Sequence, residues 1–192
     1  YSRSMQNFSF DIIGTHLGLS LETETDCSLL FAHIQDRLVW FEKKFSRFIE
    51  WNWLYTLNKE WEATLDLDGK NMLSFALRVA DSTDGYFDPT VGRRLTELWY
   101  GNQNILSSHT EKYSGNYKDV EIRDERVFLW RDVELEFWWV GKGYLIDVLY
   151  AMICLYEKNI SRFIINFWWD MYGKWGWKVW LESPFASDEV IG

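Results

Sequence analysis

The sequence has few cysteines, histidines and prolines, and fewer basic than acidic residues. Two cysteines, Cys27 and Cys154, are too few for a disulfide framework and do not have the spacing of a thiolate metal site. The histidines His16, His33 and His109 lie far apart in the sequence, so no zinc site is predicted. A net charge of -9 argues against nucleic acid and anionic lipid as partners, because their phosphates attract Lys and Arg.

Long hydrophobic runs are also missing. No apolar segment reaches the ~18 residues that would suggest a membrane span, and the longest, at 144–156, is interrupted by Asp147. No transmembrane segment is therefore predicted, and no signal peptide is visible. A hydrophobic content of 47% over 192 residues suits one globular domain with a substantial core.

Apolar spacing predicts a mixture of strands and helices. Strands are predicted at 8–21, interrupted by Gly14 and Gly18, and at 127–140, 163–167 and 178–181. Helices are predicted at 29–45, 71–82 and 144–157, and residues 100–125 are predicted to be loop or an irregular hairpin. Because no regular βαβ repeat is present, the predicted fold class is α+β.

Several short segments carry more glycine, proline and charge than a generic fold requires. In chain order they are Gly14-Thr15, Ser46-Arg47-Phe48 with Leu57-Asn58, the sequence TDGYFDPTVG at 83–92, and Gly141-Lys142-Gly143-Tyr144 with Asp147. A lysine between two glycines at a helix start favours phosphate, because backbone N–H groups and the ammonium group both attract anions. A plain turn is the alternative for so short a motif.

In this order the segments resemble those of the ApbE family, the FAD:protein FMN transferases, from Phe10 to Pro184. The TDGxFDPTVG motif of that family is matched throughout at 83–92, and its GKGYxxD motif at 141–147. The resemblance implies one ApbE-like (T-fold-like) domain over residues 1–192, with mixed helices and a mainly antiparallel sheet.

The resemblance also implies an activity. Members move FMN from FAD to a Thr or Ser hydroxyl of a target flavoprotein and release AMP, with Mg²⁺ near the diphosphate. The implied partners are therefore FAD and a flavoprotein that carries the acceptor. The family is bacterial, and the sequence does not decide between a cytoplasmic and a membrane-associated extracytoplasmic location.

Site residues follow from the matched motifs. The resemblance assigns FAD contacts to Ile13, Phe48, Tyr86, Phe87, Asp88, Glu136 and Lys142, and a metal contact to the backbone oxygen of Trp139. It assigns no catalytic residue. For Phe48 and Phe87 the alternative is a place in the core, and for Asp88, which precedes Pro89, a turn. Glu136 stands where the family has Asp.

Tryptophan is unusually frequent, with 13 residues. Several tryptophans stand where the family has glycine or another small residue, which suggests a gene whose UGA codons encode glycine but were translated as tryptophan. The positions predicted to be glycine are Trp51, Trp53, Trp99, Trp138, Trp139, Trp168, Trp169, Trp175 and Trp180. Trp177 is expected to be genuine, and Trp40, Trp61 and Trp130 are left open. The alternative is a Trp-rich surface that binds sugars or a partner.

The family's remaining metal-binding acids and its His-x-x-Asp-Pro segment follow the region where this sequence stops, at Gly192. We therefore expect the domain to be incomplete at its C-terminus, and possibly at its N-terminus, and this chain alone to be inactive. The alternative functions are a non-catalytic flavin-binding module and a Trp-rich interaction module.

Overall fold

A computed structural model describes residues 3–97, 115–130, 133–156, 160, 162–168, 170–174, 176–177, 181–182 and 190–191. Its contacts form two compact units. The first unit comprises Tyr1–Gln35 and Ile146–Gly192, and the second comprises Asp36–Leu145. Two helices, α1 (Ser28–Phe45) and α5 (Trp138–Tyr156), contribute residues to both. Each unit is described by itself.

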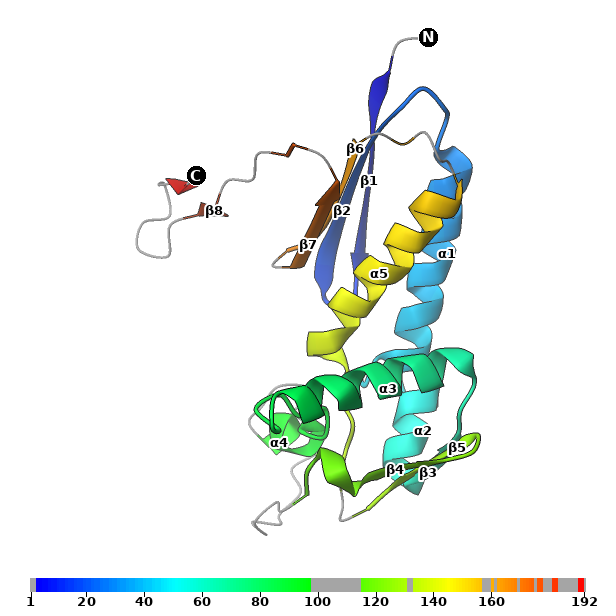
Figure 1. Ribbon diagram of the computed structural model, residues 1–192. Coiled ribbons are helices and arrows are strands. Elements are labelled where there is room, and N and C mark those ends of the chain that lie inside the picture. Colours follow the sequence, from blue (N-terminus) through cyan, green and yellow to red (C-terminus); the bar gives the residue numbers. More distant parts are fainter. Residues whose placement is uncertain are drawn as a thin grey trace. The chain divides into compact units, whose positions relative to one another are not determined.

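The first unit contains a four-stranded antiparallel sheet in the order β1-β2-β6-β7 (Figure 1). Its strands are β1 (Ser4–Ile12), β2 (Thr15–Thr23), β6 (Arg162–Phe167) and β7 (Asp170–Lys174). The single strand predicted at 8–21 is wrong, because residues 4–23 form a hairpin. Ile13 and Gly14 form its two-residue turn, with φ of 46° and 66°. Positive φ at both turn residues suits the right-handed twist of paired strands.

The core of the first unit lies between its sheet and the helices α1 and α5. Alternate side chains of β2 and β6 are buried, namely Leu17, Leu19, Leu21, Phe163, Ile165 and Phe167. The ring of Phe8 in β1 stacks on Phe31 of α1 at 5.3 Å, and Tyr150 of α5 lies 6.1 Å from Phe163. Two further short strands, β8 (Leu181–Glu182) and β9 (Val190–Ile191), pair with each other. Most of the strand predicted at 178–181 lies outside the described residues.

The second unit combines short helices with a three-stranded antiparallel sheet in the order β3-β5-β4. Its elements are α2 (Trp53–Glu60), β3 (Glu62–Thr64), α3 (Leu67–Ser82), α4 (Gly92–Glu97), the 3-10 helix η1 (Tyr117–Asp119), β4 (Val120–Arg123) and β5 (Arg126–Leu129). Its core is built from fully buried side chains, among them Leu54, Leu57, Met72, Leu73, Val127 and Leu135.

Side-chain caps explain where the helices of the second unit begin. Helix α2 was not predicted from the sequence, and it begins where Asn52 Oδ1 accepts the backbone N–H of Tyr55 at 2.7 Å. The helix predicted at 71–82 begins earlier, since Asp66 Oδ1 accepts the N–H of Gly69 at 2.8 Å. Each cap is followed by a helix with buried leucines, which are Leu54 and Leu57 in α2 and Leu73 in α3.

Helix α5 begins six residues before the predicted start at 144, and the strand predicted at 127–140 ends at Leu129. The backbone N–H of Gly141 donates to the carbonyl of Phe137 at 2.6 Å, so the Gly-Lys-Gly motif lies inside the helix. Among the described helices, α5 is the one whose length and composition could cross a membrane. Its side chains Leu145, Leu149 and Ile153 are fully buried in the fold, and 39% of the window that meets this test is buried.

Candidate functional site

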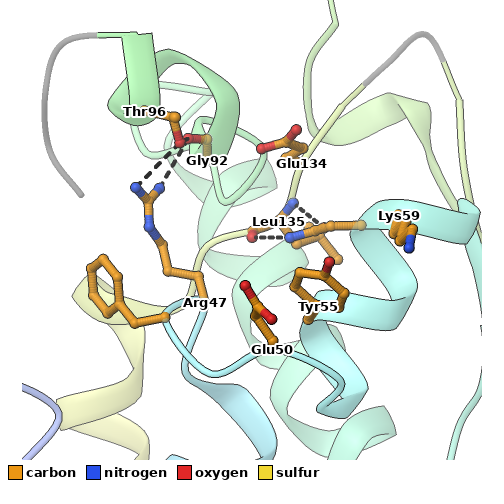
Figure 2. Close-up of a pocket in the computed structure, with 10 residues that line it drawn as sticks. Arg47, Glu50, Tyr55, Lys59, Gly92, Thr96, Glu134 and Leu135 are labelled. Atoms are coloured by element: carbon orange, nitrogen blue, oxygen red, sulfur yellow. Dashed lines mark hydrogen bonds between the residues drawn. The ribbon is translucent and has the colours of Figure 1, made fainter. Parts of the chain in front are cut away.

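A cavity of about 380 Å³ opens in the second unit (Figure 2). It is lined by Arg47, Phe48, Glu50, Tyr55, Asn58, Lys59, Gly92, Thr96, Glu134 and Leu135. These residues come from the segment after α1, from α2, from α4 and from the chain that leads into α5. Charged groups of both signs therefore surround a space large enough for part of a small molecule.

The Leu-Asn motif at 57–58 supports one wall of this cavity. Asn58 Nδ2 donates to the carbonyl of Leu135 at 3.0 Å, and its Oδ1 accepts the N–H of Leu135 at 2.8 Å. Leu57 is fully buried beside it in the sequence. The motif thus has a structural role, which is to hold the backbone that leads to Glu136.

The guanidinium of Arg47 forms another wall. Its Nη1 donates to the carbonyl of Gly92 at 3.0 Å, and its Nη2 donates to Thr96 Oγ1 at 3.3 Å (Figure 2). The N–H of Gly92 in turn donates to the carbonyl of Glu134 at 3.0 Å. A β-carbon at Gly92 would lie 2.8 Å from that carbonyl oxygen, so only glycine allows this approach. The Ser-Arg-Phe motif and the 83–92 motif are therefore in direct contact.

Asp88 shapes the 83–92 segment. Its Oδ1 accepts the N–H of Thr90 at 2.8 Å and the hydroxyl of Thr90 at 2.6 Å, and its Oδ2 accepts the N–H of Tyr117 at 3.1 Å. The turn that was the alternative for Asp88 is thus present. The next residue, Pro89, accepts the N–H of Glu136 at 2.7 Å, which places the 83–92 segment beside the start of α5.

Glu136 and Lys142 are both buried, with 6% of each residue exposed. Glu136 Oε1 accepts the N–H of Trp138 at 2.7 Å, whereas its Oε2 is buried without a hydrogen-bond partner among the described residues. Burial raises the pKa of the Glu136 carboxyl above its ordinary value, although the N–H of Trp138 and the charges of Arg47 and Lys142 oppose that shift. The Glu136 carboxyl therefore lies within the electrostatic influence of both Arg47 and Lys142.

Tryptophan rings cover Lys142. Its Nζ lies 5.5 Å from the ring centre of Trp138 and 5.8 Å from that of Trp139, within the range of cation–π attraction. The backbone oxygen predicted to bind metal belongs to Trp139, in the first turn of α5. No cluster of three or more His, Cys, Asp or Glu side chains that could hold a metal ion occurs among the described residues.

The other predicted FAD contacts differ in their surroundings. Phe48 lines the cavity and is exposed, so it is not a core residue. Tyr86 is 98% exposed, and Phe87 is half-buried, with its N–H donating to Thr83 Oγ1 at 3.1 Å. Ile13 lies in the hairpin turn of the first unit. Of the predicted FAD contacts, Phe48 is the one that lines the cavity, and contact of any of them with FAD stays a prediction.

The sequence analysis missed several residues that line the cavity. Glu50, Tyr55, Lys59, Thr96 and Glu134 belong to no motif that was singled out. Tyr55 and Lys59 are four residues apart in α2, and the ammonium of Lys59 lies 5.8 Å from the ring centre of Tyr55. This i, i+4 spacing was the available signal, but it could be recognised only once α2 was known to be a helix.

Five of the tryptophans predicted to be glycine lie among the described residues. Trp51 and Trp168 have φ of 65° and 61°, as expected of glycine positions, whereas positive φ is not found at Trp53, Trp138 or Trp139. Trp53 Nε1 donates to the carbonyl of Thr64 at 2.8 Å. The remaining four, Trp99, Trp169, Trp175 and Trp180, lie outside the described residues.

The sequence and the fold of this chain both match known proteins. The sequence model of the ApbE family matches residues 13–192, which is most of the chain. The chain belongs to the ApbE family. No curated protein sequence matches it at a comparable level.

Solved structures of ApbE proteins share the fold. The ApbE protein of Thermotoga maritima is 24% identical, with a TM-score of 0.80 over 96% of this chain and 65% of that one. The flavinyl transferase ApbE of Pseudomonas stutzeri, in its apo form, is 13% identical, with a TM-score of 0.81 over 100% of this chain and 66% of that one. The flavin transferase ApbE of Vibrio cholerae is 15% identical, with a TM-score of 0.80 over 95% and 65%. The chain thus spans just under two thirds of the length of each.

Proposed function

We propose that this chain is the FAD-binding part of an FAD:protein FMN transferase. The observation that carries the proposal is the ApbE family match over 13–192, together with the hydrogen bonds that join Arg47 to Gly92, Gly92 to Glu134 and Pro89 to Glu136 in the second unit. Arg47 and Gly92 belong to two different sequence motifs, and Glu134 and Glu136 precede a third. A shared ligand explains why residues so far apart in the sequence meet.

In the proposed reaction, a Thr or Ser hydroxyl oxygen of the target protein attacks the phosphorus of the FMN half of FAD. A new P–O bond forms to the target, the P–O bond to AMP breaks, and the hydroxyl loses its proton while AMP leaves. Little covalent chemistry is required of the enzyme, so positioning and charge neutralisation supply most of the acceleration. The partners are accordingly FAD and a flavoprotein with an acceptor hydroxyl.

The residues of this chain would bind and orient FAD. The ammonium of Lys142 suits the diphosphate, since it is buried and its interaction with an anion would be little screened by water. The aromatic rings of Phe48 and Tyr86 are exposed and could stack on the flat rings of FAD. Asp88 would act indirectly, by holding the turn that carries Tyr86.

A magnesium ion is part of the proposal only as far as these residues allow. Mg²⁺ requires near-octahedral oxygen ligands, usually one or two carboxylates with phosphate and water. The described residues offer the backbone oxygen of Trp139 but no cluster of acids, so they do not make a complete site. No step is therefore derived through the metal.

Titration of the full-length protein with FAD tests the binding. Replacing Lys142 by Met removes the buried ammonium and should weaken FAD binding by at least about tenfold, since hydrogen bonds to charged groups contribute about 1.5–3 kcal/mol. Lys43→Met is the matched control, because it removes the same charge from an exposed position in α1. Equal affinities of Lys142→Met and the unchanged protein would contradict the assigned site.

Transfer is tested separately from binding. The full-length protein, FAD, Mg²⁺ and a protein with an acceptor Thr are incubated, and free AMP and covalently bound FMN are measured. Equal amounts of both products support the transferase. FAD binding without either product would instead support the alternative, a non-catalytic flavin-binding module.

A further inference from the structure

Three tryptophans occupy backbone conformations that suit glycine. Trp51, Trp61 and Trp168 have φ of 65°, 59° and 61°, in the left-handed region. Among the residues that the structure describes, the other non-glycine residues with positive φ are Ile13, Asp84 and Asp124, and aspartate is one of the residues that tolerates this region. Tryptophan therefore accounts for three of the six non-glycine residues with positive φ in the described part of the chain.

Each of these tryptophans stands where the chain changes direction. Trp61 is the C-cap of α2, where its N–H donates to the carbonyl of Leu57 at 2.8 Å. A left-handed residue with such a bond is the usual end of a helix, and it is most often glycine. Trp51 precedes the N-cap Asn52, and Trp168 follows Phe167, which pairs with Asp170 across the β6–β7 turn.

The indole rings of these three tryptophans are mostly exposed, although that of Trp51 lies 5.6 Å from the ring of Tyr55 and 4.9 Å from the ammonium of Lys59. Trp51, Trp61 and Trp168 are 75%, 51% and 63% exposed, so little apolar surface is removed from water. At Trp61 the backbone has the structural role, because its carbonyl also accepts the N–H of Leu129 at 2.8 Å. The β-carbon of any L-residue is unfavourable in this conformation, and the large ring is not buried in return.

Trp177 and Trp40 differ from these three in backbone conformation. Trp177 Nε1 donates to the carbonyl of Phe163 at 2.8 Å, and the guanidinium of Arg162 lies 4.3 Å from its ring centre. Trp40 lies within α1, 4.4 Å from the guanidinium of Arg37. Neither has positive φ. The anomaly is therefore confined to particular positions and is not a general property of tryptophan in this fold.

We infer that the natural protein carries glycine at positions 51, 61 and 168, and that the gene has UGA codons there. UGA is a stop codon in most genomes, tryptophan in some and glycine in certain bacterial lineages. A gene of the last kind, translated with the second code, would place tryptophan at glycine positions and leave UGG-encoded tryptophans such as Trp177 unchanged. This inference rests on backbone conformation and is independent of the proposed function.

The gene and the natural protein provide the first test. Codons 51, 61 and 168 should be UGA and codon 177 should be UGG, and peptide masses of the protein from its own cells should show glycine at the UGA positions. UGG at 51, 61 and 168, or tryptophan in the natural peptides, would overturn the inference.

Melting temperatures provide a second test that does not depend on the gene. At each position the full-length protein is compared with the Trp→Gly and Trp→Ala variants, which both lack the indole. Glycine alone removes the β-carbon, so Trp51→Gly, Trp61→Gly and Trp168→Gly should each melt about 2–4 °C above the corresponding alanine variant. Alanine variants that melt at or above the glycine variants would contradict a glycine position.

A matched control comes from Trp40, in the middle of α1. There the order should be reversed, with Trp40→Gly melting below Trp40→Ala, because glycine is the poorer helix former by about 1 kcal/mol. If glycine were favoured over alanine at Trp40 as well, the effect at 51, 61 and 168 would not report on positive φ.

Discussion

Asn58 and Leu135 exchange two hydrogen bonds, although 77 residues separate them in the sequence. The side-chain amide donates to the carbonyl of Leu135 at 3.0 Å and accepts its N–H at 2.8 Å, as a neighbouring β-strand would. Leu135 is fully buried, and Glu136 follows it directly. The amide of α2 therefore satisfies the backbone of the segment that leads into α5.

Replacing Asn58 by Ala should destabilise the protein by about 2–3 kcal/mol, because it leaves the N–H and C=O of Leu135 without partners in a buried place. Denaturant unfolding measures this free energy. Asn58→Asp keeps the acceptor for the N–H of Leu135 but loses the donor to its carbonyl. Only the carbonyl of Leu135 is then left without its partner, so the loss of unfolding free energy should differ from that of Asn58→Ala. An alanine variant as stable as the unchanged protein would show that water replaces the amide.

Gly92→Ala should destabilise the protein by about 1–3 kcal/mol, because the new β-carbon would lie 2.8 Å from the backbone oxygen of Glu134. Melting of the purified variant measures the loss. Gly143→Ala is the matched control: nothing lies within 4 Å of its added β-carbon, and alanine favours helix by about 1 kcal/mol. The two variants should therefore shift the melting temperature in opposite directions.

The sequence predicted the segments that have strong periodicity. The helix predicted at 29–45 and the strand at 163–167 match α1 and β6 within one residue. The start of α5 was missed because Trp138 and Trp139 read as part of a strand, whereas Glu136 Oε1 accepts the N–H of Trp138 and supports a helix start there. Propensity alone does not reveal such a bond.

The motifs drew attention to the segments around Arg47, Asp88 and Lys142 but not to the packing between them. They predicted FAD contacts for Phe48, Asp88, Glu136 and Lys142, which stay predictions. They did not show that Arg47 binds the backbone of Gly92. Nor did they place Glu134 in the cavity, because the contact between the 83–92 segment and the start of α5 is long-range.

The carboxyl of Glu136 should give stability a distinctive pH dependence. Burial raises its pKa in the folded state above the ordinary value of 4.5, so ionisation opposes folding as the pH rises from that value through the raised pKa. Glu136→Gln does not ionise. The stability of this variant relative to the unchanged protein should therefore increase as the pH rises from 4.5 through the raised pKa, as measured by urea unfolding at a series of pH values. A difference that is independent of pH would mean that Glu136 has an ordinary pKa.

Trp138 and Trp139 should limit access of FAD to Lys142. Their ring centres lie 5.5 Å and 5.8 Å from its Nζ, and that ammonium is buried. The double variant Trp138→Gly, Trp139→Gly would uncover Lys142, and we expect it to bind FAD at least about tenfold more tightly, a gain of roughly 1.4 kcal/mol. The measurement is quenching of flavin fluorescence. Adding Lys142→Met to the double variant should abolish the gain, because the gain depends on the exposed ammonium. If the gain persisted without Lys142, the tryptophans would act through the shape of the site and not by covering the lysine.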